Sequence, residues 1–295
     1  MCAPIPIVDV SPLDGAATDQ APLVTAIASA AHGLGFFQVL GHGISTDLID
    51  RVWVQTNALF GLPMDLKQTL LRTKENPLGY YDRELTKNRR DLKEVFDFAA
   101  MDGTNRWPQT LPDFRSTLIE YFIACELLSF RLLGALCVGL GLPDTTLACH
   151  FRPVHTGFVR LNHYPIDDPV LQAARETVAP LGDMALNHHS DAGALTLLLQ
   201  DDVGGLQVLA DGDWIDVTPL NGALVVNVGD MMQIWSNDRY HATRHRVQPV
   251  TDRPRHSIPF FFNPAYETDV SPLVATESPR YRTVNWGEFR RARAD

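Results

Sequence analysis

From Gly157 onward, hydrophobic and polar residues alternate with a period of two, and this pattern limits what the chain can fold into. Turn-forming pairs such as Asp211-Gly212 and Asn221-Gly222 separate the alternating stretches. The pattern predicts strands over residues 157–164, 184–189, 194–199, 205–210, 214–217, 222–228, 231–235, 241–248 and 255–262, with a helix or loop at 167–182. Many short, regularly spaced strands with few helices between them are typical of a closed barrel or a two-sheet jelly roll.

Residues 1–150 have a different, mainly helical pattern. Apolar spacing predicts helices over 19–33, 45–60, 63–71 and 112–140, and short strands at 5–10, 36–40 and 94–98. The 112–140 helix is apolar nearly all round, which indicates a buried position. We therefore predict one domain over residues 1–295, mainly β with α, in which a region of helices and strands (1–150) braces a jelly-roll core (151–295).

Two polar segments of the N-terminal region need separate interpretation. Residues 75–90 are irregular and are expected to form a mobile loop over a site. Residues 87–93 are rich in charge and are expected to form a solvated face.

Charge and cysteine content narrow the partners and the compartment. A formal net charge of −10 argues against a nucleic-acid or anionic-membrane partner. We find no uninterrupted apolar run of the roughly 18 residues that a membrane span needs, and no signal-peptide pattern in residues 1–10. The four cysteines (Cys2, Cys125, Cys137 and Cys149) form no Cys-x-x-Cys motif, which is typical of reduced thiols. A cytoplasmic protein is expected.

His189 and Asp191 form a His-x-acid pair at the end of a predicted strand. Residues two apart on a strand point to the same face, so both side chains can turn inward. A histidine from a later strand, either His241 or His245, would complete a 2-His-1-carboxylate face, which suits non-haem Fe(II) and leaves coordination positions open. Alone, the pair could equally be a structural hydrogen-bonded pair.

Arg255 and Ser257 are also two apart on a predicted strand. A guanidinium beside a hydroxyl is a good receptor for a carboxylate. A metal face together with a carboxylate receptor implies a cosubstrate that chelates at one end and carries a free carboxylate at the other. 2-Oxoglutarate fits that description.

Several blocks carry a family resemblance: HSDAGALTLLLQDDVGGLQV, GALVVNVGD, SNDRYHATRHRV and RHSIPFFFNP, with AHGLGFFQVLGHGIS and VRLNHYP nearer the N-terminus. They closely resemble the isopenicillin N synthase-like Fe(II)/2-oxoglutarate dioxygenases. The resemblance implies a double-stranded β-helix and the iron ligands His189, Asp191 and His245, the last preferred to His241 because Arg-x-Ser follows it by ten residues. It also implies that the distal carboxylate of 2-oxoglutarate is bound by Arg255 and Ser257, with further cosubstrate contacts from Tyr164 and Asn162.

The resemblance further implies an enzyme of secondary metabolism that needs Fe(II), 2-oxoglutarate and O₂. Its reaction would be hydroxylation of an unactivated C–H of a small metabolite, or a related desaturation or cyclisation, with release of succinate and CO₂. Two alternatives remain: a 2-oxoglutarate-independent Fe(II) oxidase of the isopenicillin N synthase type, in which Arg255 and Ser257 grip substrate, and a non-catalytic jelly-roll binding protein.

The substrate pocket is the part of the family pattern from which this chain departs. Asn187-His188 stands before His189 where small residues are usual, and the 167–182 insert is unlike the compact loop of plant members. The expected substrate is small and partly apolar, with a pocket wall that includes Phe98, Phe158, Asn187 and Phe262.

Overall fold

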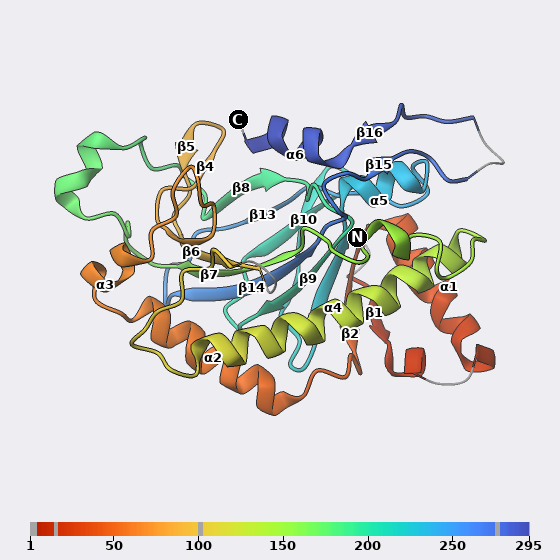
Figure 1. Cartoon of the computed structure of the whole chain (residues 1–295), viewed down its shortest axis with the longest axis horizontal. Coiled ribbons are helices and arrows are strands. Elements are labelled where there is room, and N and C mark those ends of the chain that lie inside the picture. Colours follow the sequence, from red (N-terminus) through yellow and green to blue (C-terminus); the bar gives the residue numbers. More distant parts are fainter. Residues whose placement is uncertain (1–4, 15–16, 100–102, 275–277, 295) are drawn as a thin grey trace.

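Two facing β-sheets form the centre of the molecule in the computed structural model, which describes residues 5–14, 17–99, 103–274 and 278–294 (Figure 1). The large sheet has the order β1 (Ile7–Asp9), β2 (Phe36–Leu40), β12 (Leu224–Val228), β9 (Leu195–Gln200), β14 (Arg255–Phe262), β7 (Phe158–Tyr164), β6 (Glu94–Phe98) and β3 (Gly79–Tyr81). The small sheet has the order β11 (Asp213–Asp216), β10 (Leu206–Ala210), β13 (His245–Val247) and β8 (Leu186–His189). The predicted jelly roll with helices around it is confirmed.

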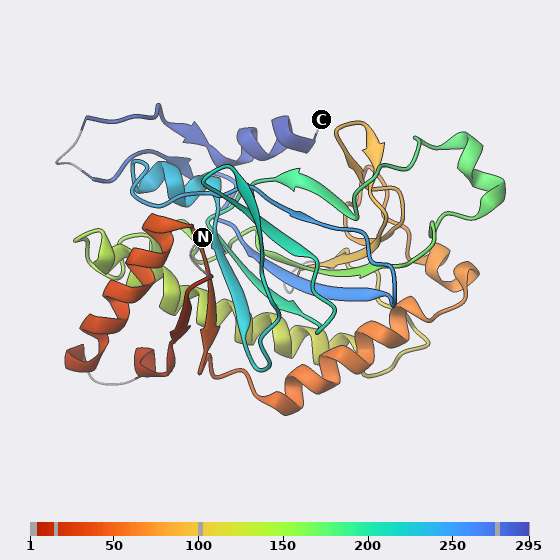
Figure 2. The same cartoon turned by 180° about the vertical axis from the view of Figure 1, so that it is seen from behind.

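The helices are α1 (Ala17–Gly33), α2 (Thr46–Phe60), α3 (Met64–Thr69), α4 (Phe114–Gly139), α5 (Asp230–Trp235) and α6 (Trp286–Ala294), with 3₁₀ turns at Ser11–Asp14, Ala148–His150 and Gln172–Thr177. Of these, α4 packs on β9 and β14 at the outer face of the large sheet, and α1 and α2 pack on α4. Helix α4 runs along the large sheet, in front of the strands in Figure 1 and behind them in Figure 2. Ser45 caps α2, because its Oγ accepts a hydrogen bond from the Leu48 amide at 3.2 Å.

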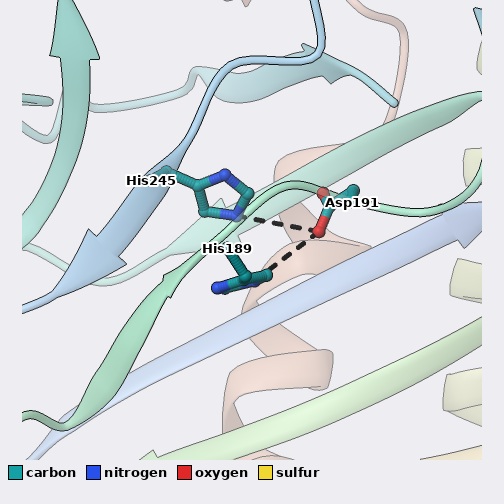
Figure 3. A group of neighbouring side chains, drawn as sticks. All are labelled: His189, Asp191 and His245. Atoms are coloured by element: carbon teal, nitrogen blue, oxygen red, sulfur yellow. Dashed lines mark ion pairs between the residues drawn. The ribbon is translucent and has the colours of Figure 1, made fainter. Parts of the chain in front are cut away.

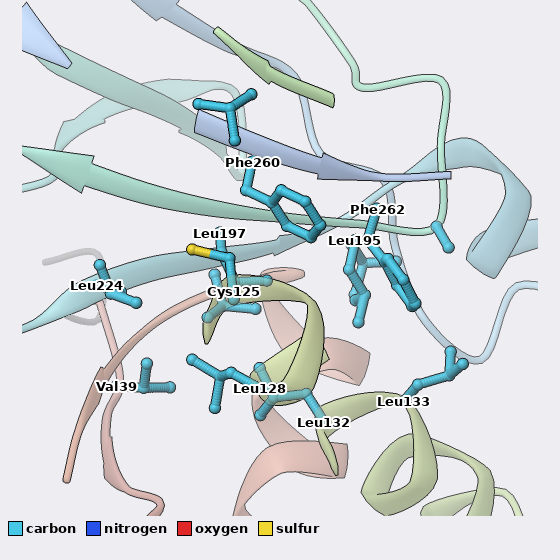
Figure 4. Packing of buried hydrophobic residues seen from close by; sticks show 14 of the residues in the cluster. Val39, Cys125, Leu128, Leu132, Leu133, Leu195, Leu197, Leu224, Phe260 and Phe262 are labelled. Carbon is cyan, nitrogen blue, oxygen red and sulfur yellow. The ribbon is translucent and has the colours of Figure 1, made fainter. Parts of the chain in front are cut away.

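The main hydrophobic core lies between α4 and the large sheet (Figure 4). Leu128 and Leu132 of α4 pack toward Leu197 of β9 and Phe260 of β14, and all four side chains are fully buried. Among the described helices, α4 alone is long and apolar enough to cross a membrane by composition, but half of its most apolar window is buried inside the protein. Its apolar character is that of a core helix, as predicted.

The predicted strand at 231–235 is wrong, because these residues form helix α5. Met231, Met232 and Trp235 are all buried, so no solvent-facing position reveals the period. A short apolar run of this kind reads alike as a buried strand or a buried helical turn. The strand expected at 241–248 is confined to His245–Val247, and the irregular 75–90 segment contains β3, β4 (Leu85–Thr86) and β5 (Arg89–Arg90).

The prediction of a solvated face at 87–93 is also wrong for the second half of that segment. Lys87 and Arg89 are exposed, but Arg90, Asp91 and Lys93 are each at most 3% exposed. Arg90 makes a bidentate ion pair with Asp168 at 2.9 and 2.7 Å and donates to the Ala179 carbonyl at 2.7 Å. The β4–β5 hairpin and the 167–182 insert are therefore joined beside the open end of the two sheets (Figure 1).

Candidate active site

The structure brings together the three predicted iron ligands at one end of the space between the sheets (Figure 3). His189 ends β8 and His245 begins β13, and the two residues are direct partners across the small sheet. Both Nε2 atoms lie 3.7 Å from Asp191 Oδ1, and the three ligand atoms lie within 4.8 Å of one another. His241 is elsewhere, with its ring 5.8 Å from that of His32.

Hydrogen bonds turn each of these side chains toward a common point. Nδ1 of His189 lies 2.9 Å from the Asn187 carbonyl, and Nδ1 of His245 lies 3.2 Å from the Thr243 carbonyl. A carbonyl only accepts, so each Nδ1 carries the proton and each Nε2 keeps a free lone pair. Such bonds fix the tautomer and the ring orientation of metal-binding histidines.

The carboxylate of Asp191 is held in the same way through its second oxygen. Oδ2 accepts hydrogen bonds from Thr196 Oγ1 at 2.5 Å and from Asn227 Nδ2 at 2.8 Å, which leaves Oδ1 toward the histidines. The side chain is 8% exposed. Thr196 of β9 and Asn227 of β12 therefore determine which oxygen of Asp191 faces the histidines.

The electrostatics of the cluster favour the protonation states that a cation requires. Burial, reinforced by the charge of His245, lowers the pKa of His189. Burial works against ionisation of Asp191, but the charges of His245 and His189 and the hydrogen bonds from Thr196 and Asn227 hold its pKa below the ordinary value. A neutral imidazole and an ionised carboxylate are the forms that bind a metal at neutral pH.

Arg255 lies in the same cavity, fully buried, with donors that have no protein partner. Its Nη2 donates to Gln200 Oε1 at 3.1 Å, whereas Nε and Nη1 have no acceptor among the described residues. Its guanidinium lies 5.0 Å from the Tyr164 ring centroid, and the pairs Arg255–Tyr164 and Ser257–Asn162 stand opposite each other across β14 and β7. Asn162 donates to Ser257 Oγ at 3.3 Å. Buried unpaired donors of this kind fit an anionic carboxylate.

The cavity has a volume of about 380 Å³ and opens between the two sheets. Alternate residues of two strands line it: Phe158, Arg160, Asn162 and Tyr164 on β7, and Arg255, Ser257, Pro259 and Phe261 on β14. The triad residues line it as well. The triad and the pair Arg255 and Ser257 therefore face one common space.

Of the four residues expected to contact substrate, only Phe158 lines this cavity. Phe98 and Phe262 do not, because each lies on the strand face that packs toward α4; Figure 4 shows Phe262 among the core residues. Asn187 does not line it either, and acts through its carbonyl on His189. Phe261 takes the place predicted for Phe262, and the period of two that places Arg255 and Ser257 inward already implies this parity.

A wall of charged, largely buried side chains was not predicted at all. Glu84, Lys93 and Arg160 line the cavity, and Arg72 and Asp97 stand directly behind them. Although Glu84 is buried, the charges of Arg160, Lys93 and Arg72 hold its pKa well below the usual range. The alternation of Arg160 with Asn162 and Tyr164 is the one sequence signal that could have placed part of this wall.

Comparisons with known proteins agree with this geometry. The family model described as 2OG-Fe(II) oxygenase superfamily matches residues 155–264, and the one described as non-haem dioxygenase in morphine synthesis N-terminal matches residues 5–112. The 2-oxoglutarate-Fe(II) type oxidoreductase hxnY of Emericella nidulans is 34% identical over 317 residues, which cover 95% of this chain and 86% of that protein.

Two solved structures are also similar over nearly the whole chain. The crystal structure of a full-length Neurospora crassa protein in complex with alpha-KG and thymine has a TM-score of 0.85 and 28% identity, and covers 98% of this chain and 96% of that one. The structure of JOX2 in complex with 2OG, Fe and JA has a TM-score of 0.84 and 31% identity, and covers 98% of this chain and 85% of that one. With the triad in place, the chain belongs to the Fe(II)/2-oxoglutarate-dependent dioxygenase family and is an oxidoreductase that uses Fe(II), 2-oxoglutarate and O₂.

Proposed function

We propose that this chain oxidises a C–H bond of a small, partly apolar metabolite, with iron held by His189, Asp191 and His245 and 2-oxoglutarate anchored by Arg255. The observation that carries the proposal is the buried guanidinium of Arg255. Two of its donors have no protein partner and line the same cavity as the triad. A buried charge left in this state needs a ligand, and a carboxylate is the complementary one.

Each residue has a separate task in this proposal. Bound Fe(II) would supply O₂ activation, coupled to conversion of 2-oxoglutarate to succinate and CO₂. Arg255 and Ser257 would bind the distal carboxylate, and Asn162 would orient the Ser257 hydroxyl through their hydrogen bond. The Tyr164 ring, which packs beside the guanidinium, would keep water from it.

The size and lining of the cavity support a small substrate. A volume of about 380 Å³ lies at the lower end of the range of small-molecule sites, roughly 300–1,000 Å³. The stacked rings of Phe158 and Phe261, with centroids 4.7 Å apart, offer an apolar surface. The two structural neighbours, whose crystals contain thymine and JA, are consistent with a small-molecule substrate.

The test is an anaerobic titration of the apo protein with Fe(II) and then 2-oxoglutarate, followed by the visible charge-transfer band of a chelated 2-oxo acid. The wild type should give the band, and His189→Ala should abolish it. Arg255→Ala and Arg255→Lys should both weaken 2-oxoglutarate binding by about tenfold or more, because a lysine cannot replace the planar guanidinium fork. The exposed variant Arg253→Ala serves as the control.

The alternatives give different outcomes in the same experiment. Iron binding without a band would favour an oxidase that does not use 2-oxoglutarate, with Arg255 as a substrate anchor. Absence of iron binding would leave only a binding protein and would refute the proposal.

We also propose a cytoplasmic location. Cys125 and Cys137 are buried and unpaired, and burial raises the pKa of the Cys125 thiol to about 12, so it is kept as an unreactive thiol. Fractionation of the producing cell, with the protein recovered from a membrane or secreted fraction, would contradict this location.

A further inference from the structure

The charged wall of the cavity contains a group of four residues whose charges satisfy one another. Arg160 binds both oxygens of Asp97 at 2.7 Å and donates to Glu84 at 3.1 Å. Arg72 binds Glu84 at 2.5 Å and lies 3.6 Å from Asp97. Two arginines and two carboxylates thus form a neutral closed set. Arg160 lines the cavity, but its guanidinium is already occupied.

Lys93 stands beside this set and is not satisfied by it. The side chain is 2% exposed, and its Nζ lies 3.7 Å from Asp91 Oδ2 and 3.8 Å from Glu84 Oε2. Both distances exceed that of a hydrogen bond, and no residue in the described part of the chain accepts one from this ammonium. Asp91 meanwhile accepts hydrogen bonds from Thr86 Oγ1 at 2.8 Å and from the Asn187 amide at 3.4 Å.

Lys93 is therefore a buried ammonium with two long ion pairs and no hydrogen bond from a described residue. Taking a lysine out of water costs several kcal/mol, which close partners normally offset. The two nearby carboxylates supply charge but no hydrogen bond, so three N–H donors remain for another partner. Lys93 lines the cavity, so a molecule bound in the cavity can reach its ammonium.

We propose that Lys93 binds an anionic carboxylate of the primary substrate and so makes this enzyme selective for small organic acids. This inference rests on the proposed function and deepens it. Lys93 belongs to the segment before β6, whereas the cosubstrate receptor Arg255 belongs to β14, so two separate cations face the one cavity. The apolar body of such an acid would lie against Phe158 and Phe261.

Arg290 of α6 also lines the cavity and, like Lys93 and Arg255, is outside the closed set. Its Nη1 donates to the Thr156 carbonyl at 3.3 Å. Its guanidinium lies 5.3, 5.8 and 6.0 Å from the ring centroids of Phe158, Tyr266 and Trp286 respectively. Arg290 is therefore engaged with aromatic surface, and it provides a matched comparison for Lys93.

The experiment uses the anaerobic Fe(II)·2-oxoglutarate complex at saturating 2-oxoglutarate, with benzoate and benzamide as probes of equal size. Binding is followed by the change in the charge-transfer band. We expect the wild type to bind benzoate about tenfold more tightly than benzamide, since only benzoate forms a charge-assisted bond with the ammonium. Lys93→Met should remove this preference, Lys93→Arg should keep most of it, and Arg290→Met should retain it. Lys93→Gln, which keeps a donor without the charge, replaces the methionine variant if the latter does not fold.

The possible results separate the two proposals. If no band forms in the wild type, the proposed function fails before the probes are added. If the band forms but responds equally to both probes, or to neither, the Lys93 inference is wrong. It is also wrong if benzoate displaces 2-oxoglutarate, if Lys93→Met weakens 2-oxoglutarate binding itself, or if the preference is lost in Arg290→Met and kept in the Lys93 variants.

Discussion

At the residue scale, the Asp191 carboxylate depends on two neighbours that do not touch the metal position. Thr196 and Asn227 both donate to Oδ2, so rotation of the carboxylate would break two hydrogen bonds inside the protein. In a buried site the loss of a partner exposes an unsatisfied charged oxygen. The ligand geometry is thus set by β9 and β12 as much as by the ligand itself.

Asn227→Ala should therefore lower the affinity for Fe(II) by about 10–100-fold while the fold is retained. Anaerobic Fe(II) titration of the apo protein, with circular dichroism as a check on folding, measures this. Asn57→Ala on the exposed face of α2 is the control, since its side chain bonds only to its own helix. An unchanged Fe(II) affinity in Asn227→Ala would show that the hydrogen bond does not position the carboxylate.

At the element scale, alternate residues of β14 point to the cavity and to the hydrophobic core. Arg255, Ser257 and Phe261 line the cavity, and Phe260 and Phe262 are buried in the core. The ring of Phe262 stacks on that of Phe151 with a centroid distance of 4.3 Å. Neighbouring residues of β14 therefore have different roles: one face of the strand lines the cavity and the other packs in the core.

Phe262→Ala should lower the free energy of unfolding by roughly 3–5 kcal/mol, because it opens a cavity in the core. Phe261→Ala should lower it much less, because that ring faces a cavity that already exists. Urea unfolding of both variants checks the order, and the charge-transfer titration should give the same 2-oxoglutarate affinity for folded Phe262→Ala as for the wild type. The reverse order of stabilities would contradict the assignment of the two faces.

His256, on the core-facing side of β14, makes the stability of the folded protein depend on pH. Burial, reinforced by the nearby His163, lowers the pKa of His256 to about 4. The unfolded chain takes up a proton near the ordinary value of 6.5, and the folded chain does not until about pH 4. Stability is therefore lost as the pH falls through that window.

His256→Phe keeps the aromatic stacking on Phe60 and His163 and removes this titration. Between pH 7 and pH 5, the free energy of unfolding should fall by about 2 kcal/mol more in the wild type than in the variant. Urea unfolding at the two pH values measures the difference. Equal losses in both proteins would mean that His256 does not control the effect.

Sequence periodicity was sufficient to predict the strands in which polar and apolar residues alternate. It placed β6 and β14 at their observed bounds and put His189 with Asp191, and Arg255 with Ser257, on common strand faces. The choice of His245 over His241 came from the family resemblance, and the structure places His245 in the triad. Periodicity could not identify α5, which has buried residues on every side. Phe262 does not line the cavity, because the residues of β14 that share a face with Arg255 are Ser257, Pro259 and Phe261.

At the scale of the whole molecule, the charges of residues 90–93 could not be placed from their own segment. Their partners come from far along the chain: Arg90 pairs with Asp168, and the wall beside Lys93 includes Arg160. Only the complete fold shows that a charge-rich run is buried. The same long-range pair ties the 167–182 insert to the β4–β5 hairpin.

Asp168→Asn should loosen this connection, because it removes the charge that both Arg90 and Arg175 face. Amide hydrogen exchange across residues 167–182 should become about tenfold faster, and exchange in β9 and β14 should not change. Mass spectrometry of the exchanging protein resolves these segments. Asp213→Asn on β11 is the control, and unchanged exchange across the insert would mean that the ion pair does not hold it.

The order of the large sheet also has a consequence for biosynthesis. Strand β2 pairs with β1 on one side and with β12 on the other, and Val39 stands opposite Leu224, about 185 residues later in the chain. Phe37 and Val39 are fully buried in the finished protein. During translation, β12 is synthesised only after most of the polypeptide, so β2 lacks this partner strand until then. Exposed apolar surface of this kind can aggregate in the meantime. We therefore expect the nascent N-terminal region to be prone to aggregation until β12 has been synthesised.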